Sequence, residues 1–161
     1  MSIEVRALTE QDEAIWRELW TGYLEFYESR VAEAVYQSTF RRMLVEGEYE
    51  PNALIAWDED RAVGLVHYMF HRHCWRIENV CYLQDLYADP SVRGQGIGRA
   101  VLEALIEQAR SMNADAIWLE TNSNLKAATH LYEKCGFRHL SENELWPTPY
   151  ARCNLQMVLE L

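Results

Sequence analysis

Hydrophobic and polar residues recur along this chain with two periods, and each change of period marks a predicted element. Alternation predicts strands, and apolar residues at every third or fourth position predict amphipathic helices. The predicted elements are a strand at 3–5, helices at 10–28 and 31–44, a hairpin of strands at 53–57 and 62–70, a strand at 77–88, a helix at 97–112, a strand at 114–120, a helix at 124–134 and two final strands flanking Pro147 and Pro149. This order predicts an α/β domain over residues 1–161, with a mixed sheet and about four helices.

The strand predicted at 77–88 has an irregular apolar pattern. Leu83 and Leu86 differ by three positions, whereas Leu86 and Ala88 differ by two. A strand that keeps all three on one face needs an extra residue, which predicts a β-bulge near Gln84 and Asp85. A strand buried on both faces would give the same pattern without a bulge.

Composition places the chain among acidic globular proteins. Apolar residues make up 49%, charged residues 25%, and the net charge is −10. Such a charge repels phosphate backbones and anionic lipid surfaces, so we expect neither nucleic-acid nor membrane binding. The same negative charge would attract a cationic partner.

Residues 1–10 lack the basic and apolar regions of a secretory signal, and the four cysteines form no C-x-x-C pair. We therefore expect reduced thiols in a cytoplasmic protein.

Three histidines and a cysteine lie close together between positions 67 and 74. His67, His71, His73 and Cys74 are residue types that bind metals. Their segment has the pattern of a strand, in which these positions need not converge on one ion. We therefore expect no metal site there, and the alternative is a metal centre formed by these four side chains.

The glycine-rich turn Arg93-Gly94-Gln95-Gly96-Ile97-Gly98-Arg99 lies between a predicted strand and a predicted helix. Free amides and the positive end of the helix dipole coincide there, and two arginines add charge. This combination predicts a pyrophosphate cradle. Its spacing fits neither the G-x-G-x-x-G dinucleotide fingerprint nor a P-loop. The alternative is a flexible helix start with two solvated arginines.

A second motif follows in the helix predicted at 124–134, which Gly136 would terminate. Taken alone, Leu131 and Tyr132 would be core residues. Taken with the glycine-rich turn, they complete a resemblance to the GCN5-related N-acetyltransferase (GNAT) superfamily. Its signature [Q/R]-x-x-G-x-[G/A] resembles Arg93-x-x-Gly96-x-Gly98, and its later element resembles Asn124, Ala127 and residues 131–137 (LYEKCGF). Residues 19–27, 64–68 and 81–87 are similar to histone and polyamine acetyltransferases, whereas residues 149–157 resemble other branches.

The resemblance implies a mostly antiparallel sheet of six or seven strands whose fourth and fifth strands splay apart. It implies acetyl-CoA as the donor and a small amine as the acceptor, and family habit suggests a homodimer. The pantetheine arm would pair with the backbone of Leu86, Tyr87 and Ala88. The pyrophosphate would bind the amides of Gly94–Arg99, and Asn124 would contact the cofactor.

The resemblance also implies catalytic roles. The Tyr132 hydroxyl would protonate the departing CoA thiolate, and a backbone amide near Leu86 would stabilise the oxyanion. Either Glu78 or Asp85 would take the amine proton, directly or through water. The alternative for both carboxylates is a solvated or paired side chain.

The acceptor is expected to be a primary amine: a small-molecule amine, a polyamine, or the amine of a lysine or amino acid. Carboxylates and aromatic rings of the first helix could form its cleft, although most of those rings could equally be core; the residues concerned are Trp16, Trp20, Tyr23, Glu25, Phe26, Tyr27 and Glu28. We expect direct attack in a ternary complex. The alternatives are a non-catalytic acyl-CoA sensor or scaffold, a longer acyl donor, or a hydroxyl acceptor.

Overall fold

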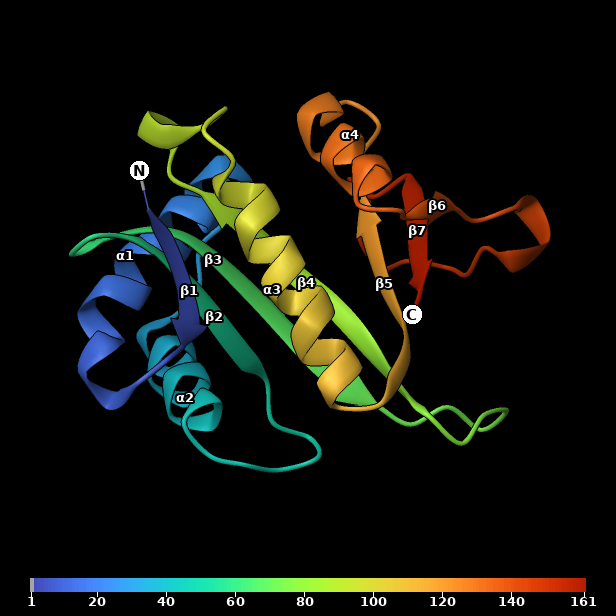
Figure 1. Cartoon of the computed structure of the whole chain (residues 1–161), viewed down its shortest axis with the longest axis horizontal. Helices are drawn as coiled ribbons and strands as arrows, with labels where there is room; N and C mark the ends of the chain where they lie inside the picture. Colours follow the sequence, from blue (N-terminus) through green and yellow to red (C-terminus); the bar gives the residue numbers. More distant parts are fainter. Residues whose placement is uncertain (1) are drawn as a thin grey trace.

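The computed structural model describes residues 2–161 and shows a seven-stranded sheet with helices on both faces (Figure 1). The strands are β1 (Ile3–Ala7), β2 (Asn52–Asp58), β3 (Arg61–His71), β4 (Asn79–Ala88), β5 (Ala114–Thr121), β6 (Arg138–His139) and β7 (Leu155–Glu160). The α-helices are α1 (Glu13–Phe26), α2 (Glu33–Met43), α3 (Ile97–Ser111) and α4 (Lys126–Lys134). The strand order is β1-β2-β3-β4-β5-β7-β6, and the β4–β5 pair is parallel among antiparallel neighbours. The predicted fold class and element order are confirmed.

Strand β2 shows why the sheet is buried on both faces. Its residues alternate between the two sides, as the period of a strand requires. Leu54 and Ala56 pack in the core that α3 covers, whereas Ala53, Ile55 and Trp57 pack in the core beneath α1 and α2. Figure 1 shows α3 lying across one face, with α1 and α2 covering the other. The chain therefore has two hydrophobic cores separated by one sheet.

Three element ends differ from the sequence prediction. A single 3-10 turn, η1 (Glu10–Asp12), precedes α1, because the Asp12 carboxylate accepts hydrogen bonds from Thr9 and fixes this entry. Helix α4 begins at Lys126 rather than Asn124, because the Asn124 amide donates to the Asn122 side chain in a turn. The helix predicted at 97–112 ends at Ser111, and Met112 caps it with 46% of its surface exposed.

Strand β4 contains the predicted bulge. Tyr68 of β3 lies opposite Leu83, and His67 lies opposite Asp85, so Gln84 is the extra residue. Leu83, Leu86 and Ala88 consequently all pack in the core beneath α3. The irregular spacing in the sequence was therefore the signature of a bulge rather than of a strand buried on both faces.

Beyond the bulge, β4 and β5 separate. Their last paired residues are Tyr82 and Trp118, whose rings stack with centroids 4.0 Å apart. Strand β5 continues along β7 to Thr121, whereas the rest of β4 pairs with β3 alone. Residues 83–88 therefore present a free backbone edge toward β5. We call this opening the slot, and the Tyr82–Trp118 stack forms its base.

Candidate active site

The free edge of β4 leads directly to the glycine-rich turn. Asp89 ends the strand, the 3-10 turn η2 (Pro90–Val92) follows, and Gly96 is the N-cap of α3. Gly94 and Gly96 have φ of +80° and +86°, a conformation that favours glycine, and open space surrounds both α-carbons. Residues with side chains would be strained there and would cover the backbone.

The amides of this turn are available to a ligand. The Gln95 amide donates to the Val92 carbonyl, and the Ala100 amide donates to the Gly96 carbonyl. Among residues 2–161, no acceptor lies within hydrogen-bond distance of the amides of 96–99. These amides sit at the positive end of the α3 dipole, so the turn forms an anion cradle built mainly from backbone.

The two arginines of the motif make contacts within the protein. Arg93 Nε donates to the Ala88 carbonyl at 3.3 Å, and its guanidinium lies over the Phe26 ring. Arg99 Nε donates to Glu103 at 2.7 Å in an exposed i,i+4 pair. An exposed pair of this kind contributes little to stability, so Arg99 can turn toward an anion.

Tyr132 lies on α4, beside the slot. The helix ends in a Schellman motif: Gly136 has φ of +96°, its amide donates to Glu133, and the Phe137 amide donates to the Tyr132 carbonyl. Burial raises the pKa of the Tyr132 hydroxyl, and Tyr27 at the end of α1 raises it further. These tyrosines belong to helices on opposite faces of the sheet.

Asp85 lies on the α1 side of the slot, because the bulge turns it away from the α3 core. His67 Nδ1 is 2.8 Å from Asp85 Oδ2, and the carboxylate side chain is 13% exposed. Burial raises the pKa of Tyr23 on α1, and the negative charge of Asp85 raises it further. Asp85 is thus a largely buried carboxylate held against two polar side chains.

The aromatic residues of α1 divide into two groups. Trp16 and Trp20 are buried in the core beneath α1 and α2, as the alternative interpretation expected. The rings of Tyr23 and Tyr27 pack at a tilt of 56° with centroids 4.9 Å apart, and both lie within the field of Asp85. Phe26 is 49% exposed. The part of α1 near the slot is therefore its last two turns.

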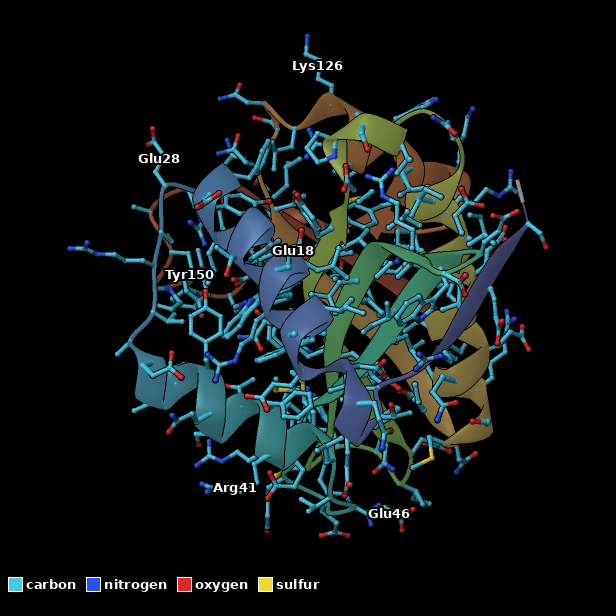
Figure 2. All side chains as sticks on the ribbon, turned by 90° about the vertical axis from the view of Figure 1, so that its left-hand side faces the viewer. Glu18, Glu28, Arg41, Glu46, Lys126 and Tyr150 are labelled. Atoms are coloured by element: carbon cyan, nitrogen blue, oxygen red, sulfur yellow. The ribbon has the colours of Figure 1, made fainter. Side chains whose placement is uncertain are left out.

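A segment between β6 and β7 closes the same region. The Arg152 guanidinium lies 4.3 Å from the centroid of the Tyr27 ring, and its Nη1 is 3.5 Å from the Tyr27 carbonyl. Arg152 Nη1 also lies 3.5 Å from the hydroxyl of Ser29 in the chain that connects α1 to α2, and Figure 2 shows Tyr150 on the same side of the molecule as this connection. Both oxygens of Glu120 on β5 accept hydrogen bonds from this segment, one from Trp146 and one from Thr148.

Two predicted site residues lie apart from this group. Glu78 precedes β4 and is seven positions before Asp85, about 20 Å away along an extended strand. The structure does not bring these two carboxylates together. Asn124 lies exposed in the turn before α4, two residues ahead of the helix.

The histidines and cysteine between 67 and 74 have separate partners. His67 is buried against Asp85, whereas His71 Nε2 accepts from Trp118 Nε1 at 2.8 Å. Within residues 2–161, no three His, Cys, Asp or Glu side chains are grouped closely enough to hold a metal ion. No helix in the same range is long and apolar enough to cross a membrane.

Two surface hollows lie outside the slot. One, of about 370 Å³, is lined by α1, the β2–β3 turn and the end of β4, and the other, of about 530 Å³, lies between α3 and α4. Neither contains Asp85 or Tyr132. The candidate chemistry therefore belongs to the slot, which forms by separation of strands rather than as a surface cavity.

A comparison with known protein families shows which family the chain belongs to. The profile of the Acetyltransferase (GNAT) family matches residues 13–137, which include the slot, the cradle and Tyr132. The chain belongs to the GNAT family. It is therefore an acyltransferase, and the resemblance carried by the two motifs is confirmed.

The individual relatives of this GNAT protein match different shares of its length. It is 29% identical over 138 residues to D-amino-acid N-acetyltransferase HPA3 of Saccharomyces cerevisiae, covering 84% of this chain and 85% of that protein. It is 34% identical over 84 residues to thialysine N-epsilon-acetyltransferase of Bos taurus, covering 52% of this chain and 49% of that one. The chain thus spans most of HPA3 but about half the length of the bovine enzyme.

Solved structures show the same GNAT fold. A probable acetyltransferase superposes with a TM-score of 0.79 at 22% identity, covering 94% of this chain and 99% of that one. The NatC complex bound to Gag peptide and CoA contains a chain that superposes with a TM-score of 0.76 at 20% identity, covering 100% and 99%. At such identities the likeness concerns the fold alone.

The sequence did not single out two residues of this site, His67 as a partner of Asp85 and Arg152 as a partner of Tyr27. His67 lies 18 positions from Asp85, and Arg152 lies 125 positions from Tyr27. No local motif joins residues so far apart. The one usable signal for His67 was a lone histidine in an otherwise apolar strand.

Proposed function

We propose that this protein transfers the acetyl group of acetyl-CoA to a primary amine by direct attack within a ternary complex. One observation carries the proposal: the free edge of β4 at 83–88 leads through the short η2 turn to the amide cradle at 94–99. An extended arm that ends in a pyrophosphate matches this track, because strand edges pair with amides and helix starts bind anions.

The donor would lie along this track. Leu86, Tyr87 and Ala88 would pair with the pantetheine arm, and the amides of 94–99 would hold the pyrophosphate, with Arg93 and Arg99 adding charge. Asn124 would contact the arm from the turn before α4. When bound, acetyl-CoA supplies the activated acyl group, and its thioester would lie near the bulge, between Asp85 and Tyr132.

The chemistry then needs three proton transfers. Asp85 first accepts a proton from the bound ammonium group, directly or through water, and passes it to solvent, which leaves the neutral amine. The amine nitrogen attacks the thioester carbon, the C–S bond breaks, and the Tyr132 hydroxyl gives its proton to the sulfur. The attacking nitrogen loses its second proton to Asp85, after which Asp85 releases this proton to solvent and Tyr132 regains one from solvent. A raised pKa keeps Tyr132 protonated before the step, as an acid requires. Glu78 remains an alternative base only through a longer water path.

The acceptor side suits an amine that also carries a carboxylate. Asp85 offers a negative charge for the ammonium group, and Tyr23 and Tyr27 offer ring faces. Arg152 lies against Tyr27, and within residues 2–161 it has no carboxylate within ion-pair distance. Together with the likeness to a D-amino-acid N-acetyltransferase, this supports free amino acids as the first acceptors to test, ahead of polyamines.

The experiment is a free-thiol release assay with acetyl-CoA and a panel of acceptors. The panel contains D- and L-amino acids, their amides, polyamines, lysine peptides and an alcohol control. We expect thiol release with amines, and amino acids should exceed their amides if Arg152 binds the carboxylate. Binding of acetyl-CoA without release would favour the sensor or scaffold alternative, and release with the alcohol would favour hydroxyl transfer. Parallel assays with propionyl- and succinyl-CoA compare the donors.

A further inference from the structure

Two buried hydrogen bonds connect α1 to the bulged strand. Trp16 Nε1–H donates to His67 Nε2 at 2.9 Å, and His67 Nδ1 lies 2.8 Å from Asp85 Oδ2. Trp16 is 0% exposed and His67 is 2% exposed, so both bonds are shielded from solvent. Asp85 is the last residue of this series of hydrogen bonds and the one that reaches the slot.

The indole fixes the state of the imidazole. An indole N–H can only donate, so Nε2 must present its lone pair and cannot carry a proton while this bond exists. The single proton of the ring therefore resides on Nδ1, which donates it to Asp85. The imidazole is neutral and is held in one tautomer and one orientation.

We propose that Trp16 and His67 are positioning residues that hold Asp85 as an ionised, correctly oriented carboxylate for the acceptor amine. The proposal rests on the proposed function of this site. A neutral donor steadies the carboxylate without cancelling its charge, whereas an imidazolium in the same place would form an ion pair with it. Asp85 thus keeps the ability to bind an ammonium group and to accept its proton.

The groups that surround Trp16, His67 and Asp85 do not disturb the two hydrogen bonds between them. Trp20 packs edge-on against the His67 ring with centroids 5.4 Å apart. The titratable groups that face this cluster are four phenols: Tyr36 lies against Trp16, and Asp85 acts on Tyr23, Tyr27 and Tyr82. Beyond these phenols lie Arg152, which acts on Tyr23 and Tyr27, and Glu120 and Tyr150, which act on Tyr82. Burial raises the pKa of Tyr23, Tyr27 and Tyr82, so these phenols stay neutral in the range where an amine acceptor is tested.

The chain offers a matched control for Trp16. Trp20 lies in the same core, one helical turn later, and its ring stacks on Trp16 with centroids 5.2 Å apart. Its buried Nε1 has no hydrogen-bond partner within residues 2–161. Trp16→Phe and Trp20→Phe therefore remove the same group from the same core, but only Trp16→Phe frees His67 Nε2.

The first measurement uses the unaltered protein. Two-dimensional NMR of protein labelled with ¹⁵N in histidine distinguishes the two tautomers and the imidazolium, and the His67 signals are identified by their loss in His67→Gln. We expect His67 to show the Nδ1–H tautomer throughout pH 6–8. An Nε2–H tautomer or an imidazolium in this range would overturn the proposal, even if every tryptophan variant failed to fold.

The second measurement is the pH profile of kcat/KM for the acceptor. Trp16→Phe should add one protonation step on the acidic side, below which activity falls about tenfold for each pH unit, because protonated His67 pairs with Asp85. Trp20→Phe should keep the original profile, and both should retain the Kd for acetyl-CoA. Equal profiles for the two variants would refute the positioning role. Absence of transfer to any amine would instead remove the proposed function, which the NMR result does not address.

Discussion

At the scale of single residues, the proposed mechanism assigns to Tyr132 the proton that the departing sulfur takes up in each turnover. We expect Tyr132→Phe to lower kcat at least tenfold, the usual scale for loss of a general acid, with little change in the Kd for acetyl-CoA. Steady-state kinetics and calorimetry measure the two quantities. Tyr68→Phe is the control, since it removes another hydroxyl from the same buried core. An unchanged kcat in Tyr132→Phe would remove this residue from the mechanism.

Asp12 is the residue whose ionisation should matter most clearly for folding. It forms two hydrogen bonds with the Arg6 guanidinium, at 2.8 and 3.0 Å, and accepts two more from Thr9. These contacts, the Arg6 bond first, lower its pKa to about 2. A carboxylate with a depressed pKa stabilises the folded state above its unfolded pKa, near 4, and this contribution is lost as the pH falls toward 2.

We therefore expect Asp12→Asn to lower the free energy of unfolding by about 2 kcal/mol at pH 7. The difference from the original protein should shrink steadily between pH 4 and pH 2. Urea unfolding at several pH values measures it. Glu33→Gln, which alters an exposed pair with Arg17, should have a smaller effect. A difference that stays constant down to pH 2 would contradict this account.

At the scale of elements, we propose that the start of α3 determines donor binding. Gly96→Asp adds a side chain at a φ of +86° and a negative charge among the free amides, so calorimetry should detect no binding of acetyl-CoA. Gly96→Ala is the matched variant, because it adds backbone strain without charge and should weaken binding less. Retained binding in Gly96→Asp would mean that the pyrophosphate lies elsewhere.

The elements also show which structural features can be predicted from sequence patterns. The bulge was predictable from the spacing of Leu83, Leu86 and Ala88, because these apolar residues can share one face of the strand only if it contains an extra residue. The Gly136 terminus of α4 was predictable because its signal is local. The start of α4 was not, because the side chain of Asn122 captures the Asn124 amide and delays the helix. Such competition between a turn and a helix is decided by single hydrogen bonds.

At the scale of the whole molecule, the net charge of −10 and the anion cradle act at different ranges. Backbone amides act at contact distance, whereas the net charge acts over a Debye length of about 8 Å at physiological salt. We expect kcat/KM for a cationic acceptor such as a polyamine to fall severalfold as NaCl rises from low to physiological concentration. A neutral amine is the control. A salt response equal for both amines would show that the surface charge does not steer the acceptor.

The whole fold also explains which site residues a sequence cannot reveal. Trp16 and His67 are 51 positions apart and meet only because α1 packs on the face of β3 that His67 shares. A histidine in a strand gives no sign of its partner, since the pattern records burial and not contact. The two motifs that carry the GNAT resemblance were visible because each lies within one short stretch of sequence, whereas the support beneath Asp85 depends on tertiary packing.

The extra residue at Gln84 can be described as a change of parity. Before it, odd-numbered positions of β4 face the α3 core, and after it even-numbered positions do. A regular strand that kept Gln84 would direct either Asp85 or its apolar neighbours to the wrong side of the sheet. Deleting Gln84 alone would give a strand with one parity throughout, in which Leu86 and Ala88 still face the α3 core and Asp85 still faces away from it. Such a single-residue deletion would therefore remove the bulge while leaving the chemistry of the two faces unchanged.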